Sequence, residues 1–143
     1  MNAWLKSLVL RLAPRRAAAP EPMPTPPLRR NPDWPPSPER ARELLDRGES
    51  VPRDWLDRQV TIDEAEAMYT TPPDQRSPKS PEDVLPFGRI NWQWEALKSV
   101  MQPGDELWTY ASPVESWRAL AGVSGLVVVR AGAPVAAMIT IRN

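Results

Sequence analysis

Three side chains near the C-terminus could in principle perform acid–base chemistry: Glu106, Glu115 and Arg118. Two carboxylates can share the roles of general acid and general base, and an arginine can stabilise developing negative charge. The sequence contains no His and no Cys, which excludes Ser-His-Asp and Cys-His hydrolases, zinc fingers and His-ligated metalloenzymes. A small His-free enzyme that uses these three residues therefore stays open as an alternative function.

The spacing of the polar candidates favours structural roles. Ser112-Pro113-Val114-Glu115 combines a potential N-cap, a Pro at the first helical position and a Glu at the third, which predicts the start of a short helix. Asp105 fits a turn, and Arg130 fits the end of a strand at a hairpin. We therefore predict no catalytic residue and interpret Ser112 and Glu115 as helix caps.

No motif predicts a cofactor or a metal ion. A P-loop is absent, and Gly122 with Gly125 lacks the third glycine of a dinucleotide fingerprint. Acidic residues cluster at Asp63, Glu64 and Glu66, but their spacing lacks the EF-hand loop and its central Gly. A solvated acidic helix N-terminus is the better interpretation of that cluster.

Four of the seven tryptophans fall between positions 92 and 117. They predict either an aromatic platform for a partner, a base or a sugar, or the core of a small fold. Trp94 and Trp117 lie on the apolar sides of their predicted helices, so we assign them to the core. Trp92 falls off that face and is predicted to be an exposed contact, while Trp108 fits either role. The residues predicted to contact a partner are Trp92, Trp108, Arg118 and Arg130.

The first thirty residues carry a net charge of +5, and residues 1–13 fit a short basic amphipathic helix. This segment either contacts anionic lipid or nucleic acid, or docks on its own domain or has no role. No apolar run is long enough to span a membrane, and the charges do not fit a secretory signal. We expect a cytoplasmic protein, with peripheral membrane association as the alternative. The residues that would make the lipid or nucleic-acid contact are Trp4, Lys6, Arg11, Arg15 and Arg16.

Proline divides the middle of the chain. Ten prolines between positions 14 and 38 predict an extended, disordered linker over residues 14–36, with a PxxP spacing at 24–27 that fits a spacer better than an SH3 ligand. Residues 37–69 are predicted as an acidic segment of short helices, begun by Ser37-Pro38 and by a Thr61–Glu64 capping box. Residues 70–83 form a second Pro-rich connector.

Residues 84–143 predict a small α+β domain. Asn91 is predicted to cap a helix that ends at Pro103-Gly104, a strand covers 106–111, and the short helix after Ser112 follows. Two β-branched runs, at 125–130 and 134–141, enclose a Gly-containing turn and predict a hairpin. The expected fold is a three-stranded, mostly antiparallel sheet with helices, preceded by short helices and a disordered Pro-rich N-terminus.

Three stretches of the C-terminus follow a recognisable pattern: PGDELW at 103–108, SPVESW at 112–117 and AGVSG at 121–125. About the last 45 residues resemble a group of small bacterial proteins whose C-termini follow the pattern PGDELW…SPPESW…GRAG…LVRDG. Val114 replaces the usual second Pro, and Ala131 stands where an Asp would make a better turn. The resemblance implies a domain boundary and a bacterial or phage origin, and it implies no activity.

The predicted sheet is too small to shield both of its faces by itself. It needs the helices of residues 37–69, a second copy of the chain or a partner to cover it. We therefore predict a non-catalytic bacterial or phage accessory protein that binds another protein or itself, as an adaptor, an immunity-like inhibitor or a structural component. The alternatives are the His-free enzyme and the lipid or nucleic-acid contact of residues 1–30.

Overall fold

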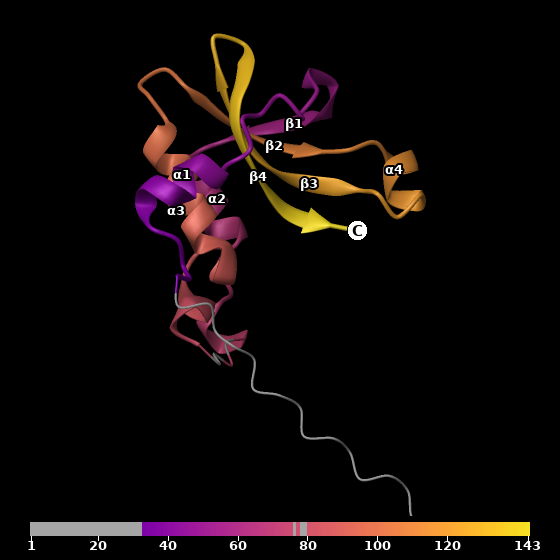
Figure 1. Cartoon of the computed structure of the whole chain (residues 1–143). Coiled ribbons are helices and arrows are strands. Elements are labelled where there is room, and N and C mark those ends of the chain that lie inside the picture. Colours follow the sequence, from indigo (N-terminus) through magenta and orange to yellow (C-terminus); the bar gives the residue numbers. More distant parts are fainter. Residues whose placement is uncertain (1–32, 76, 78–79) are drawn as a thin grey trace, which may run out of the picture. The chain divides into compact units, whose positions relative to one another are not determined.

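Four antiparallel strands form a single sheet in the order β1-β2-β3-β4 (Figure 1). The computed structural model describes residues 33–75, 77 and 80–143. The strands are β1 (Leu56–Val60), β2 (Glu106–Ala111), β3 (Val123–Arg130) and β4 (Ala133–Arg142). The α+β class and the antiparallel pairing are confirmed. The predicted number of three strands is wrong, because β1 adds a fourth.

Strand β1 lies within the segment that the sequence predicted as helical. It pairs with β2, with Leu56 opposite Tyr110 and Val60 opposite Leu107, and a bulge interrupts the ladder after Leu56. Its three central residues are Asp57, Arg58 and Gln59, and all three are exposed. An edge strand with polar side chains on both sides lacks the alternation that identifies a strand.

The helices are α1 (Pro38–Leu44), α2 (Ile62–Met68), α3 (Asn91–Val100) and α4 (Val114–Arg118). Two predicted N-caps are confirmed: Ser37 Oγ accepts the Arg40 amide, and Thr61 forms a reciprocal capping box with Glu64. The Thr61 backbone amide donates to the Glu64 carboxylate, and this bond lowers the pKa of Glu64. Short-range cap signals therefore fix the beginnings of α1 and α2.

The predicted cap at Ser112 is wrong. Helix α4 has Pro113 at its N-cap position and no side-chain cap, and Ser112 instead extends the pairing between β2 and β3. Its amide donates to the carbonyl of Val123, and its buried Oγ accepts the Val123 amide at 3.0 Å. The Ser112 hydroxyl therefore belongs to the pairing of β2 with β3, and not to the N-cap of α4 that the local sequence predicted. Asn91 is likewise the first residue of α3 and not its cap.

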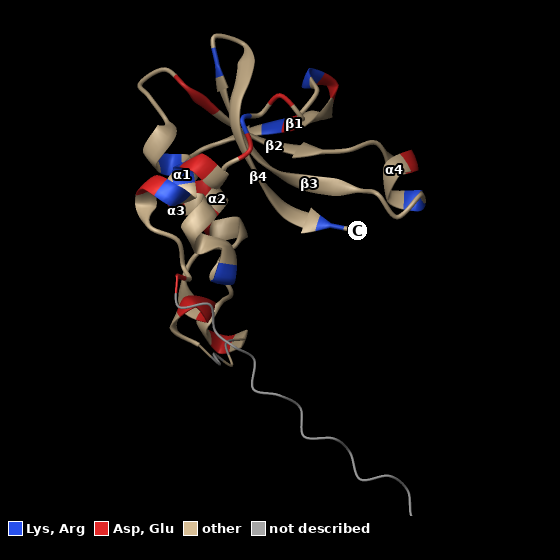
Figure 2. Cartoon of the chain, in the orientation of Figure 1, with Lys and Arg blue, Asp and Glu red and all other residues tan. Residues whose placement is uncertain are grey.

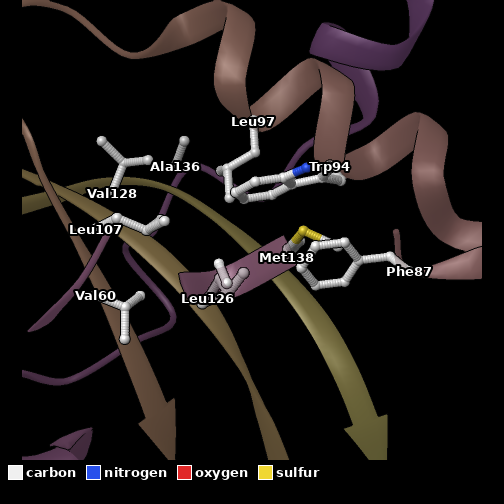
Figure 3. Packing of buried hydrophobic residues seen from close by; sticks show 10 residues of the cluster. Val60, Phe87, Trp94, Leu97, Leu107, Leu126, Val128, Ala136 and Met138 are labelled. Atoms are coloured by element: carbon white, nitrogen blue, oxygen red, sulfur yellow. The ribbon is translucent and has the colours of Figure 1, made fainter. Parts of the chain in front are cut away.

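The main core lies between the sheet and helices α2 and α3 (Figure 3). Trp94 and Leu97 of α3 are fully buried and point toward Leu126 and Met138 on the sheet. Phe87 stacks between Tyr69 and Trp94, with ring centroids 4.5 and 4.8 Å away. Trp94 is therefore a core residue, as the sequence predicted, whereas Trp117, which was also assigned to the core, is only partly buried and belongs to neither buried cluster.

The opposite face of the sheet packs against the segment between α1 and β1. Val51, Tyr110, Val127 and Val129 are buried in a second cluster, and Trp55 packs against it. The backbone of this segment also lies along the edge of β4, where the Ala137 amide donates to the Asp46 carbonyl. The sequence left open whether residues 37–69, a second copy of the chain or a partner covers the sheet. The structure shows that residues from 37–69 cover this face.

A two-residue turn joins β3 to β4, which confirms the predicted hairpin (Figure 1). Ala131 and Gly132 both have positive φ, at 49° and 77°. Two consecutive left-handed residues match the twist of the flanking strands, and glycine adopts this conformation without steric cost. Ala131 adopts this conformation although its Cβ makes a positive φ unfavourable, which agrees with the prediction that another residue would suit the turn better.

Candidate functional site

A hollow opens between the end of the Pro-rich segment, helix α1 and helix α3. Its volume is about 260 Å³, and its apolar wall is formed by Trp34, Pro35, Pro36, Leu85 and Trp92. We call it the aromatic hollow. Helices α1 and α3 pack together, and the buried Ala41 of α1 and Ala96 of α3 both line the hollow. Small side chains at these two positions leave room beside the large rings.

Two tryptophans from distant parts of the sequence meet at this hollow. The rings of Trp34 and Trp92 lie edge to face, with centroids 5.2 Å apart and an interplanar angle of 80°. Trp34 is 54% exposed and Trp92 is half-buried. The Trp92 Nε1 atom is buried and has no hydrogen-bond partner among the described residues. Trp92 thus lies at the surface, but inside a hollow and against a second aromatic ring.

A second hollow of about 130 Å³ lies at the other end of the contact between α1 and α3. Its charged lining consists of Arg42, Asp46, Arg47 and Arg130, and we call it the basic hollow. Arg42 lines both hollows, so they are neighbours. Both oxygens of Asp46 already accept hydrogen bonds, from the Gly48 amide and the Ser50 hydroxyl.

Arg130 is held in place by internal contacts. Its Nε and Nη2 atoms donate to the two oxygens of Asp105 at 2.9 and 2.8 Å, and Nη2 also donates to the Val100 carbonyl at the end of α3. The hydrogen bonds from Arg130 lower the pKa of Asp105. The Arg130 side chain still keeps 37% of its surface exposed toward the basic hollow. Its predicted partner contact stays a prediction.

The other predicted contact residues lie elsewhere. Trp108 packs on the second cluster, on the face of the sheet away from α3, and its Nε1 atom donates to Glu106 at 2.8 Å. Arg118 is exposed at the end of α4. The structure therefore places Trp92 and Arg130 in two neighbouring hollows, and it places Trp108 and Arg118 outside both. The lipid or nucleic-acid residues at positions 4, 6, 11, 15 and 16 lie outside the described residues.

The residues of the alternative enzyme are not brought together. Glu106 begins β2, whereas Glu115 and Arg118 follow its other end on α4, and a strand of this length extends about 17 Å. Burial raises the pKa of Tyr110 to about 12, so its hydroxyl stays protonated at neutral pH. Within the described ranges, no three acidic side chains are grouped closely enough to hold a metal ion.

Comparison with known proteins identifies no relative of this chain. The chain matches no family model, no curated protein and no solved structure at a significant level. The resemblance of the C-terminal pattern therefore stays a prediction. Along the part of the chain that the structure describes, no helix is both long and apolar enough to cross a membrane.

Sequence reasoning missed three residues of the two hollows: Trp34, Arg42 and Arg47. Trp34 falls in the segment predicted as a linker, yet it packs on α3. One signal was available, because Trp34 is the only aromatic residue between Trp4 and Trp55. A single aromatic ring at the end of a proline-rich stretch is typical of a docking point. Arg42 and Arg47 carry no comparable signal, since charged residues are frequent from position 39 to position 49.

Proposed function

We propose that this chain is a non-catalytic protein-binding module that seats a large apolar side chain of its partner in the aromatic hollow. The Trp34–Trp92 pair carries the proposal, because two partly exposed rings converge on one concave surface. Tryptophans in such positions dominate the binding energy of protein interfaces. An apolar cavity of roughly 150 Å³ holds a benzene molecule, so the aromatic hollow has room for an aromatic or a branched aliphatic side chain.

The two rings contribute differently. Trp34 exposes half of its surface, and covering that surface releases water from an apolar ring. Trp92 forms part of the wall of the hollow and is held in place by α3, so a partner meets a preformed surface. A preformed site costs little conformational entropy on binding. This arrangement supports recognition of a short segment more than a broad, flat interface.

The proposal can be tested with a phage-displayed library of random twelve-residue peptides, selected for binding to the full chain. We expect enriched peptides that bind the wild-type chain and the Trp108→Ala variant equally but lose at least tenfold in affinity for Trp34→Ala. Trp108 is the matched control, because it is a partly exposed tryptophan on the other face of the sheet.

Trp34→Ala is chosen because its ring is exposed, so the thermal midpoint should stay close to that of the wild type. Failure to enrich any peptide would overturn the proposal. Peptides that bind Trp34→Ala as tightly as the wild type would overturn it as well, because their site would lie elsewhere.

A further inference from the structure

The aromatic and basic hollows are neighbours along one seam, the contact between α1 and α3. On α3, the lining residues run from Trp92 through Ala96 to Val100. On α1, Arg42 belongs to both hollows, and Leu45 follows it in the basic hollow. A helix rises 1.5 Å per residue, so Trp92 in the aromatic hollow and Val100 in the basic hollow lie about 12 Å apart along the axis of α3.

The charges at this seam are unevenly satisfied. The carboxylate of Glu95 is bound to Lys98 at 2.9 Å, and both oxygens of Asp46 accept internal hydrogen bonds. The Nη2 atom of Arg42 lies 3.9 Å from the Oε1 atom of Glu39, which is the longest distance that still counts as an ion pair, and both side chains are exposed. Arg47 is exposed and forms no ion pair with any other described residue.

Positive charge therefore exceeds negative charge in the lining of the basic hollow: Arg130 is paired with Asp105, and Arg42 and Arg47 share the lining with a single carboxylate, that of Asp46. Figure 2 shows that α1 itself carries both signs of charge. The other arginine of α1, Arg40, is paired with Glu43 at 2.8 Å and lines neither hollow. Arg130 also donates a hydrogen bond to the partly buried Val100 carbonyl at the end of α3, which would otherwise repel an anion.

We propose that the partner segment carries a large apolar residue and an Asp or Glu three or four positions away, bound in an extended conformation along the α1–α3 seam. An extended chain covers about 3.3–3.6 Å per residue, so three to four residues match the 12 Å between Trp92 and Val100. The apolar side chain fills the aromatic hollow, and the carboxylate contacts Arg42 and Arg47. This inference rests on the proposed function and names the chemistry of its partner.

The same peptide library separates this inference from the function on which it rests. Peptides enriched on the wild-type chain should align on an apolar residue with an acidic residue three or four positions away. The double variant Arg42→Gln/Arg47→Gln should bind them about tenfold more weakly, since two surface ion pairs are lost, and the affinity for the wild type should fall with added salt. Arg40→Gln should bind as the wild type does.

Each other outcome overturns a defined part. Peptides that share an apolar residue without an acidic one, or that bind the double variant at full strength, would refute the acidic partner and leave the aromatic hollow as the binding site. Peptides whose acidic residue lies at random distances would refute the extended seam. A library that yields no binder would refute the proposed function itself, and this inference with it.

Discussion

The carboxylate of Glu66 joins α2 to α3, and its removal should weaken the fold more than removal of a neighbouring surface carboxylate. Its Oε1 atom accepts the indole proton of Trp94 at 2.8 Å and the ammonium group of Lys98 at 3.0 Å. Trp94 is fully buried, so Glu66→Ala leaves its Nε1–H without an acceptor among the described residues. An unsatisfied buried donor costs about 1–3 kcal/mol.

Glu95→Ala is the matched control. Glu95 also binds Lys98, at 2.9 Å, but it is more exposed and has no contact with the Trp94 indole proton. An exposed ion pair contributes about 0–1 kcal/mol. In urea, monitored by tryptophan fluorescence, Glu66→Ala should lower the unfolding midpoint by about 1 M, and Glu95→Ala by much less. Equal midpoints for the two variants would show that the Trp94–Glu66 hydrogen bond does not stabilise the fold.

The same contact predicts the dependence of stability on pH. The hydrogen bond from Trp94, and then that from Lys98, lowers the pKa of Glu66 below its ordinary value. A carboxyl group with a lowered pKa in the folded state stabilises the fold above its unfolded pKa of about 4.3, and this contribution is lost as the pH falls through the folded value. The free energy of unfolding of the wild type should therefore exceed that of Glu66→Gln at pH 7, and the two should converge in acid.

Three further substitutions test single features of the sheet. Gly125→Ala should destabilise the fold by about 2–3 kcal/mol in urea titrations, because a Cβ there would overlap the carbonyl oxygen of Met138 in the neighbouring strand. Ser112→Asp should cost about 2 kcal/mol or more, because the site is buried, whereas an N-cap would accept Asp at no cost. Ala131→Asn should raise the melting temperature by a few degrees, because Asn tolerates positive φ in a two-residue turn; an unchanged or lower value would contradict the strain at this residue.

The elements that sequence could predict are those whose signal is local. The Thr61–Glu64 capping box needs four consecutive residues, and the β3–β4 hairpin needs two β-branched runs and a Gly between them. Both were found where they were expected. A cap or a tight turn is decided by hydrogen bonds and φ angles within a few residues, so composition and spacing are sufficient to recognise it.

The elements that sequence could not predict depend on partners far along the chain. Strand β1 becomes a strand because it pairs with β2, about fifty residues later, and its own polar residues give no alternation. Ser112 has the ideal composition for a cap, yet the amide of Val123 takes its hydroxyl. Such competition is decided by the whole sheet, and a single sequence contains no local record of it.

The candidate site shows the same division. Trp92 was predicted to be exposed because it falls off the apolar face of α3, and it is half-buried in the wall of the aromatic hollow. Its neighbour Trp34 lies 58 positions earlier and was assigned to the linker. The packing of α1 on α3 creates the hollow between them, and neither segment alone indicates it. Half of the site was therefore accessible to sequence reasoning, and the convergence of its two halves was not.

The position of this site changes the physical reason for expecting a binding protein. From sequence, the reason was a sheet that could not cover itself, but α2, α3 and the segment before β1 cover both of its faces. At the seam between α1 and α3, Trp34 and Arg42 belong to neither buried cluster. The proposed binding and the stability of the fold therefore rest on different residues. Substitution of Trp34 or Arg42 should weaken the proposed recognition in a stable protein, whereas substitution of Trp94 should unfold the sheet and the α1–α3 seam together.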